Sequence, residues 1–312
     1  MKNQLKTLAK LMVLSVFLNS CEKDANEFES NEIGSETTET METIEAVGAA
    51  QAIPGEYIVV YKENKSLAGK ALQMKAKTNQ VLSKNGIKED KVKYVYDKVA
   101  QGFAIKNLSE AELGRLKEDD QVAYIQPNYI YQLDIEKGTS VAASSSHQSK
   151  ASLNDSELSN GEILPWGVQR VGSRDGTGKR CWIIDSGIAS HDDLIIDTAN
   201  SKSFVEGNSD WRDENGHGTH VAGIVAAKKN RSGVIGVAYG ATVVSIRVAN
   251  ATGQASIGAT IAAADYVAGK IKPGDVWNAS IIFDFFNQSE AVAMKQAFTN
   301  LGNKAPGVIA AG

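Results

Sequence analysis

The 312-residue sequence predicts two domains: an α+β domain of the ferredoxin-like type, followed by an α/β domain built on a parallel sheet. Residues 51–133 predict the first domain, because strand-like and helix-like stretches succeed one another there in the order βαββαβ. Residues 163–312 predict the second domain, because short apolar runs alternate with helical stretches. Between them, residues 134–162 contain almost no large apolar side chain, which predicts a flexible linker.

The elements of the first domain follow from residue type, periodicity and one capping signal. Four stretches have strand character, and residues 68–83 have the apolar spacing of a helix. Ser109 and Glu112 have the spacing of a capping box, so a second helix is expected to begin there and to run through Lys117. The four expected strands are residues 56–62, 91–97, 101–107 and 121–133.

The near-continuous apolar runs of the second domain predict the strands of a parallel sheet, with helices as the connections. In such a sheet, functional groups gather at the carboxyl ends of the strands. The expected strands are residues 179–188, 241–248, 275–281 and 306–312, and the expected helices are residues 217–228, 256–268 and 289–301.

The formal net charge of −4 is distributed unevenly along the chain. Residues 22–50 carry nine acidic side chains and one lysine, a net charge of −8, so the rest of the chain carries +4. This acidic stretch is rich in threonine and serine and predicts a solvated tether. Nucleic-acid binding needs a concentrated basic face, so the sequence predicts no nucleic-acid partner.

Residues 1–21 have the layout of a secretory signal, with lysines followed by the apolar run 11–18 and then by small or polar residues. The apolar run is too short for a membrane-spanning helix. The last four residues, LNSC, resemble a bacterial lipobox, in which Cys21 becomes the lipidated first residue of the mature protein. We therefore expect an exported protein, lipid-anchored at the bacterial cell envelope or cell surface. The plainer alternative is cleavage nearby, with Cys21 incidental.

Two residues suited to acid–base chemistry lie at expected element ends. Asp185 ends the apolar strand CWIID, at the edge of the sheet where functional groups collect. His217 opens a helix, where the positive end of the helix dipole disfavours the imidazolium. A histidine base there needs a counter-charge, which Asp185 could supply. The alternatives are an ordinary Asp-Ser-Gly turn and a histidine satisfied by backbone groups at a helix start.

The segments that hold these residues, IIDSGI and NGHGTHVAG, resemble the aspartate and histidine segments of the subtilisin-like serine proteases, the subtilases. The stretches PWGVQRV, KSFVEG and GVAYGATVVSIRV continue the resemblance around them. Residues 51–133 are similar to the inhibitory, chaperone-like prodomain of that family, with YIVVYK, QGFAIK and VAYIQPN in matching places. The resemblance covers about residues 50–133 and 163–312, and it implies the N-terminal portion of a subtilisin-like peptidase domain behind a prodomain.

The resemblance implies a zymogen of a serine endopeptidase that hydrolyses peptide bonds. In the family, the aspartate orients and supports the histidine, and the histidine deprotonates a serine that attacks the peptide carbonyl. Asp185 and His217 would take the first two roles, and the second histidine of the motif, His220, would be structural. The partners implied are a protein or peptide substrate, the prodomain as an intramolecular inhibitor, and a membrane through the lipid anchor.

The resemblance also indicates where substrate would bind. Residues 253–255 have the sequence Gly-Gln-Ala where the family usually has Gly-Ser-Gly. The segment that follows Ser280 has Ile282 and Phe283 where the family usually has two glycines. Bulky side chains in place of glycine would narrow the cleft, so the family's specificity is not carried over. The substrate-binding residues implied are Gly253, Gln254, Ala255 and Ser280.

The family's third segment, an oxyanion-hole asparagine and a Gly-Thr-Ser-Met-Ala nucleophile, does not occur before Gly312. Ser140 lies in a similar stretch, GTSVAA, but this stretch belongs to the expected linker and is interpreted as a chance match. The chain as it stands is therefore expected to be inactive, and residues 163–312 are expected to be unstable alone. Two hypotheses remain: an exported zymogen whose full product is longer, and a non-catalytic binding module whose prodomain inhibits or chaperones a separate subtilase.

No cofactor is expected. Structural calcium is common in the family, but no matching ligand cluster can be read from this sequence. The two histidines of HGTH are three residues apart, whereas zincin helices place them four apart with a glutamate between them. We therefore expect no metal site, and a metal-dependent hydrolase is kept only as a third hypothesis.

Overall fold

The computed structural model of the protein describes residues 51–133, 156–158, 161–281 and 291–310. The expected signal segment, lipobox and tether lie outside these ranges, and so do Ser140, Ile282 and Phe283. Among the described residues, no helix combines the length and the apolar character needed to cross a membrane.

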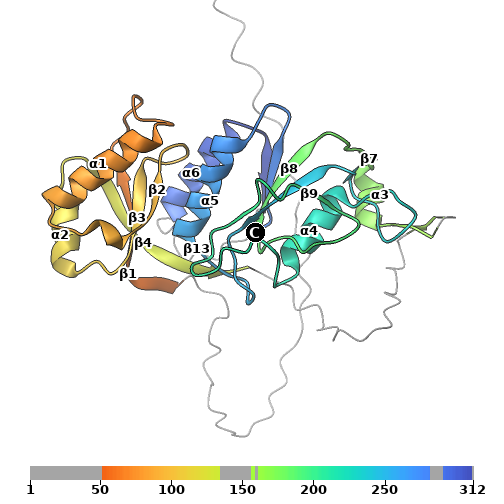
Figure 1. Cartoon of the computed structure of the whole chain (residues 1–312), viewed down its shortest axis with the longest axis horizontal. Helices are drawn as coiled ribbons and strands as arrows, with labels where there is room; N and C mark the ends of the chain where they lie inside the picture. The colour runs from red at the N-terminus through yellow and green to blue at the C-terminus, as the bar shows by residue number, and fades with distance from the viewer. Residues whose placement is uncertain (1–50, 134–155, 159–160, 282–290, 311–312) are drawn as a thin grey trace, which may run out of the picture. The chain divides into compact units, whose positions relative to one another are not determined.

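The first domain is an antiparallel sheet with two helices, in the predicted order βαββαβ (Figure 1, orange to yellow). Its strands lie in the order β4-β1-β3-β2, and β13 of the second domain extends the sheet beyond β4. A turn of 3-10 helix at Glu89–Lys91 leads into β2. The elements are β1 (Gln51–Tyr61), α1 (Ala71–Lys84), β2 (Val92–Tyr96), β3 (Gly102–Ile105), α2 (Glu110–Glu118) and β4 (Val122–Gln132).

The second domain is built on the predicted parallel sheet, with strand order β10-β12-β8-β14-β15. Strands β8 and β12 pair in register from Arg180 opposite Thr242 to Asp185 opposite Arg247. The strands of this sheet are β8 (Arg180–Asp185), β9 (Ile195–Ile196, beside β12), β10 (Lys202–Ser203), β12 (Thr242–Arg247), β14 (Val276–Ala279) and β15 (Gly307–Ile309). The other elements are α3 (Trp166–Val171), α4 (His217–Ala226), α5 (Ile257–Lys270), α6 (Val292–Gly302), β13 (Gln254–Ser256) and the parallel pair β7 (Arg174–Asp175) and β11 (Ala238–Tyr239).

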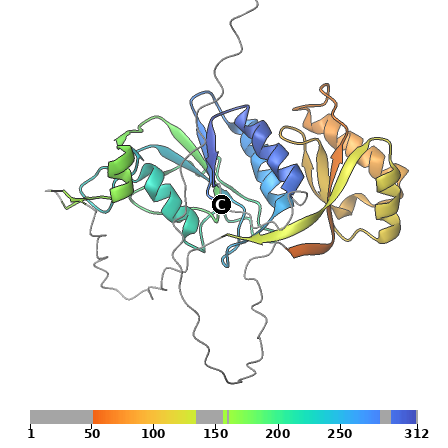
Figure 2. The same ribbon diagram turned by 180° about the vertical axis from the view of Figure 1, so that it is seen from behind.

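Helices cover both faces of the parallel sheet, which explains the continuous apolar sequence of β8. Trp182 and Ile184 belong to the core formed with α5 and α6, whereas Cys181 and Ile183 belong to the core formed with α4. Figure 2 shows the same arrangement from behind, with α5 and α6 on one side of the sheet and α4 on the other. The fold class predicted from the sequence is confirmed.

Strand β1 alternates in the same way between the two faces of the first domain's sheet. Val59 and Tyr61 pack with α1 and α2 in the first domain's own core. Ile58 and Val60 belong to the core that contains the residues of α5 and α6. The helices α5 and α6 are therefore shared between the two sheets.

Two side chains of β4 satisfy backbone groups at the starts of these shared helices. Asn128 Oδ1 accepts a hydrogen bond from the backbone N–H of Gly258 at 2.9 Å, in the first turn of α5. Gln126 Oε1 accepts from the backbone N–H of Ala293 at 3.0 Å, in the first turn of α6. The first N–H groups of a helix have no partner within the helix, so each bond replaces a missing one.

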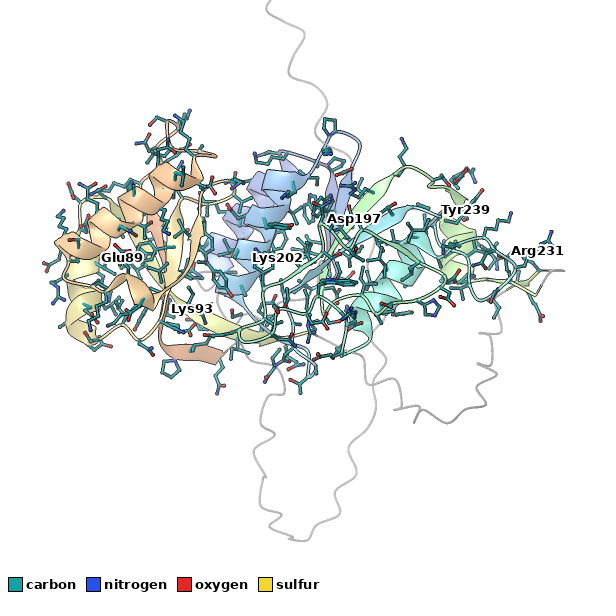
Figure 3. The ribbon with its side chains drawn as sticks, in the orientation of Figure 1. Glu89, Lys93, Asp197, Lys202, Arg231 and Tyr239 are labelled. Carbon is teal, nitrogen blue, oxygen red and sulfur yellow. The ribbon has the colours of Figure 1, made fainter. Side chains whose placement is uncertain are left out.

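Charged side chains add to the contact between the domains. Asp265 of α5 is buried, and its Oδ1 accepts hydrogen bonds from the three consecutive N–H groups of residues 97–99, at 3.2, 2.7 and 2.9 Å. Lys93 of β2, labelled in Figure 3, pairs with Glu56 of β1 and with Glu206 of the second domain, each at 2.8 Å. The contact of Asp265 and the pair of Lys93 with Glu206 each join residues more than a hundred positions apart in the sequence.

Some residues of the predicted linker belong to a short two-stranded sheet. Strand β5 (Ser156–Glu157) pairs antiparallel with β6 (Ile163–Leu164). Glu162, between them, is fully buried, and its Oε1 accepts a hydrogen bond from the backbone N–H of Arg231 at 2.6 Å. The polar composition of this stretch could not predict the burial of Glu162, because the backbone group that bonds to its carboxylate lies far along the chain.

The predicted capping box forms at the start of α2. Ser109 Oγ accepts from the backbone N–H of Glu112 at 3.4 Å, and Glu112 Oε2 accepts from the backbone N–H of Ser109 at 2.8 Å. Lys91 donates to the same carboxylate at 2.7 Å. The bond from Lys91, together with that from Ser109, lowers the pKa of Glu112 from 4.5 to about 2.

Replacing Glu112 with Gln should destabilise α2 in a pH-dependent way. Because the folded state lowers the pKa of this carboxyl, its contribution is complete above about pH 4.5 and disappears as the pH falls toward 2. We expect a loss of about 1 kcal/mol at pH 7, from the cap and the partly exposed ion pair together. Amide hydrogen exchange across α2 at pH 7 and pH 2.5 measures it. Glu110→Gln, at an exposed position of the same turn, is the control; an equal effect of both substitutions would contradict the prediction.

Candidate active site

Asp185 and His217, the predicted catalytic pair, are in contact at the carboxyl end of β8. Asp185 is the last residue of β8 and is fully buried, and His217 is the first residue of α4. His217 Nδ1 lies 2.7 Å from Asp185 Oδ1, and the backbone N–H of Ser186 donates to the same oxygen at 2.7 Å. Asp185 Oδ2 is buried and has no hydrogen-bond partner among the described residues.

The hydrogen bond with Asp185 raises the pKa of His217 above its ordinary value, although partial burial opposes this. The side chain of His217 keeps 20% of its surface exposed. When the neutral ring donates its Nδ1 proton to Asp185, Nε2 is left as an acceptor. The pair can therefore take a proton at Nε2, because the carboxylate stabilises the imidazolium that forms.

Two glycines allow the start of α4 to approach the end of β8. A Cβ at Gly218 would lie 2.2 Å from the carbonyl oxygen of Gly187 and 3.1 Å from Asp185 Oδ1. Gly187 has a φ of 117°, and a Cβ there would lie 2.7 Å from the backbone nitrogen of Asp213. A side chain at Gly218 would push the helix away from the end of β8, and a side chain at Gly187 would push away the loop that precedes the helix, which gives a physical reason for both glycines.

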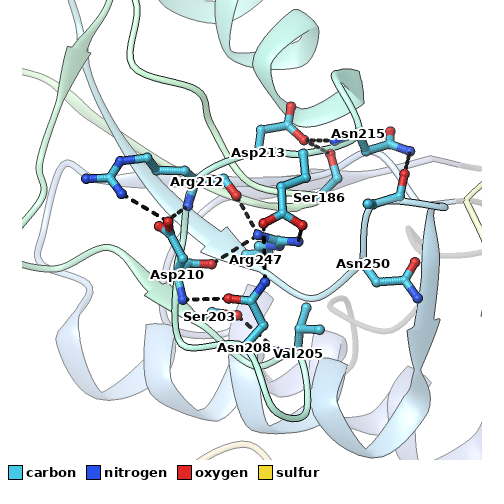
Figure 4. Close-up of polar contacts among 12 residues, drawn as sticks. Ser186, Ser203, Val205, Asn208, Asp210, Arg212, Asp213, Asn215, Arg247 and Asn250 are labelled. Carbon is cyan, nitrogen blue, oxygen red and sulfur yellow. Dashed lines mark hydrogen bonds and ion pairs between the residues drawn. The ribbon is translucent and has the colours of Figure 1, made fainter.

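Arg247 was not singled out from the sequence, although it organises the loop that leads to His217 (Figure 4). Its side chain is fully buried at the end of β12. The guanidinium donates to the carbonyl oxygens of Asp210 at 3.2 Å and Arg212 at 2.7 Å, and to the carboxylate of Glu214 at 2.8 Å. The sequence feature that could have identified Arg247 is its position at the end of an apolar strand, at the edge of the sheet where functional groups gather.

The predicted substrate-binding strand is already paired. Gln254 and Ala255 belong to β13, which runs antiparallel to β4 with Gln254 opposite Gln132 and Ala255 opposite Tyr131. The carbonyl oxygen of Gly253 accepts a hydrogen bond from the backbone N–H of Leu133 at 2.8 Å. The last strand of the first domain therefore occupies this strand's edge.

Ser280, the fourth predicted substrate-binding residue, follows β14 at the carboxyl edge of the parallel sheet. Because β14 runs parallel to β8, this is the edge at which Asp185 lies. Ser280 Oγ accepts a hydrogen bond from Asn278 Nδ2 at 3.0 Å. The neighbouring Ile282 and Phe283, predicted to narrow the cleft, lie outside the described residues.

His220 lies about one helical turn after His217 in α4. It lines an apolar pocket of about 710 Å³, together with Gly223 and Ile224 of the same helix. Within the described part of the chain, no cluster of three or more histidine, cysteine, aspartate or glutamate side chains could hold a metal ion.

Two family models match the chain. Residues 177–312 match the subtilase family, and residues 56–134 match the peptidase inhibitor I9 family. A solved crystal structure of a cold-adapted subtilisin-like serine proteinase is similar at 27% identity and a TM-score of 0.35, over 44% of this chain and 53% of that one.

Curated proteases are similar over parts of their length. Alkaline serine exoprotease A of Vibrio alginolyticus is 29% identical over 244 residues, which are 74% of this chain and 41% of that protein. The thermostable alkaline protease of Halalkalibacterium halodurans is 37% identical over 115 residues, 35% of this chain and 31% of that protein. Subtilisin Savinase of Lederbergia lenta is 40% identical over 103 residues, 31% of this chain and 38% of that protein. The chain thus spans less than half the length of these relatives.

Replacing Asp185 with Asn should lower the pKa of His217, because the hydrogen bond to the carboxylate is the main cause that raises it. An NMR titration of the histidine ring protons in the full chain measures this pKa, with His217→Gln identifying the resonance. Asp192→Asn removes an exposed carboxylate of the loop after β8 and should leave the titration unchanged. An unchanged pKa of His217 in the Asp185→Asn variant would show that the ion pair does not form in solution.

Proposed function

Because residues 177–312 match the subtilase family and residues 56–134 match the peptidase inhibitor I9 family, we propose that this chain is part of the zymogen of a serine endopeptidase. In this proposal, the peptidase hydrolyses peptide bonds of a protein or peptide, and the first domain is its intramolecular inhibitor. The proposal includes export and a lipid anchor at Cys21, as the N-terminal sequence predicts.

The contact between Asp185 and His217 carries the proposal. His217 Nε2 would take the proton of a serine hydroxyl as the serine oxygen attacks the peptide carbonyl, and would later give it to the leaving amine. Asp185 would hold the ring through Nδ1 and stabilise the positive charge at that moment. In the proposed enzyme, the serine would lie in a further segment of the polypeptide, since the chain spans less than half the length of the relatives that it matches.

The pairing of β4 with β13 supports the inhibitory role of the first domain. An extended substrate adds to an exposed strand edge through main-chain hydrogen bonds. Here residues 130–133 of the first domain make those bonds with residues 253–256. A substrate on this strand would have to displace them, and this supports inhibition by strand occupancy. The alternative, a binding module that inhibits or chaperones a separate subtilase, rests on the same contact.

The native polypeptide, purified from its source, should hydrolyse peptide bonds, and His217→Gln should reduce kcat by roughly 10⁴- to 10⁶-fold. His191→Gln is the matched control, because His191 is exposed on the loop after β8. Loss of activity on chelation, with His217→Gln still active, would favour a metal-dependent hydrolase instead.

The intact mass of the same preparation tests the rest of the proposal. A mass above that of residues 21–312 with a lipid modification agrees with a longer, anchored zymogen, whereas an unmodified N-terminus contradicts the anchor. A mass that matches the 312-residue sequence without its signal, and no peptidase activity, would favour the binding module.

Residues 51–133 should inhibit a purified subtilase such as subtilisin Savinase in trans. Leu133→Pro removes the N–H that donates to Gly253 and should weaken inhibition about tenfold, the effect of roughly 1.4 kcal/mol. Leu72→Ala is the control, because Leu72 is 82% exposed on α1, which packs on the opposite face of the sheet. Inhibition constants from substrate hydrolysis give the comparison; equal constants for Leu133→Pro and the unchanged segment would argue against strand occupancy.

A further inference from the structure

A second carboxylate, Asp213, lies between the end of β8 and the first turn of α4. It belongs to the loop that Arg247 holds, four residues before His217. Its carboxylate accepts hydrogen bonds at both oxygens. Oδ1 accepts from Ser186 Oγ (2.9 Å) and from the backbone N–H groups of Asn215 (2.9 Å) and Gly216 (3.0 Å), and Oδ2 accepts from the backbone N–H (3.0 Å) and Oγ1 (2.6 Å) of Thr219.

This arrangement supplies α4 with the cap that its own N-cap residue lacks. The N-cap is Gly216, which has no side chain to accept a hydrogen bond from the first turn. Asp213 replaces that side chain, and its negative charge lies at the positive end of the helix. Burial favours the neutral carboxyl, but the hydrogen bonds from Thr219, Gly216 and Asn215 outweigh it and lower the pKa of Asp213. The group is therefore anionic at neutral pH.

Ser186 connects this carboxylate to the Asp185–His217 pair, and Figure 4 shows its contact with Asp213. The side chain of Ser186 is fully buried, and its Oγ donates to Asp213 and accepts from the backbone N–H of Gly218 at 2.9 Å. Its backbone N–H donates to Asp185 Oδ1, the oxygen that contacts His217. One residue thus touches both carboxylates and the first turn of the helix that carries the histidine.

A second connection runs through Thr219. Its Oγ1 donates to Asp213 and accepts from the backbone N–H of Ala189, at 2.9 Å, in the loop after β8. The backbone of Asp213 lies so close to Gly187 that a Cβ on residue 187 would clash with the backbone of Asp213. The β8 turn, the start of α4 and the loop before His217 therefore meet around a single carboxylate.

We propose that Asp213 is a positioning residue for the Asp185–His217 pair, a role that rests on the proposed function. Through Ser186 and Thr219 it fixes the end of β8 against the first turn of α4, and so fixes the distance between His217 Nδ1 and Asp185 Oδ1. Its negative charge also adds to that of Asp185 in favouring the protonated ring of His217. Among the described residues, the charges of Asp185 and Asp213 both raise the pKa of this ring.

The test uses NMR of the full chain and needs no peptidase activity. The readouts are the pKa of His217 and the downfield resonance of its Nδ1 proton, which reports the hydrogen bond to Asp185. Asp213→Asn should lower this pKa and shift or abolish the resonance. Ser186→Ala keeps the charge but removes the bridge, so it should shift the resonance with less effect on the pKa. Asp210→Asn, at a partly exposed carboxylate of the same loop, should change neither.

A wild-type resonance and a wild-type pKa in folded Asp213→Asn would overturn the inference. Should that variant fail to fold, Ser186→Ala decides, and a wild-type resonance in it would likewise overturn the inference. Asp185→Asn separates this failure from failure of the proposed function. When Asp185→Asn alters the pKa of His217 and Asp213→Asn does not, only the positioning role is wrong; when neither does, the catalytic pair itself is absent.

Discussion

The burial of the Asp185 carboxylate is the constraint on which the site depends. A carboxylate with no exposed surface is costly unless hydrogen-bond donors surround it. Its Oδ1 accepts hydrogen bonds from the backbone N–H of Ser186 and from the ring of His217. The hydrogen bond from His217 requires α4 to begin beside the end of β8. That approach excludes a side chain at Gly218, and the hydrogen bonds of Asp213 hold it in place. The burial of the Asp185 charge therefore explains why a glycine is needed at position 218 and why Asp213 lies beside the first turn of α4.

The shared helix α5 joins this site to the first domain. Ten of its residues are buried, including Asp265, because the parallel sheet lies on one side and the first domain's sheet on the other. A helix that is apolar nearly all round is stable only when both sides are covered. The N–H groups that Asp265 binds and the Asn128 side chain at its N-terminus both come from the first domain. The first domain therefore stabilises an element on which the parallel sheet also packs.

Sequence reasoning predicts what is local or periodic. The apolar run of β8, the capping box at Ser109 and the main helices and strands of both domains follow from neighbouring residues. The pairing of Asp185 with His217 follows from the gathering of functional groups at strand ends and from the family resemblance. The addition of β13 to the first domain's sheet did not follow, because its partner in β4 lies more than a hundred residues earlier. Arg247 and Asp213 were missed for the same reason: an arginine ending a strand and an aspartate in a polar loop have no pattern that names their distant partners.

The occupied strand and the assembled pair coexist, which constrains how the proposed zymogen would be kept inactive. His217 already contacts Asp185 while residues 130–133 pair with β13. In the proposed zymogen, the first domain would therefore not act by separating the histidine from its aspartate. In the proposed enzyme, inhibition would come from occupancy of the strand that binds substrate. Release of the first domain would then expose that strand, and the contact between Asp185 and His217 would need no rearrangement. The cost of activation would then be the loss of the β4–β13 ladder and of the first domain's contacts with α5 and α6.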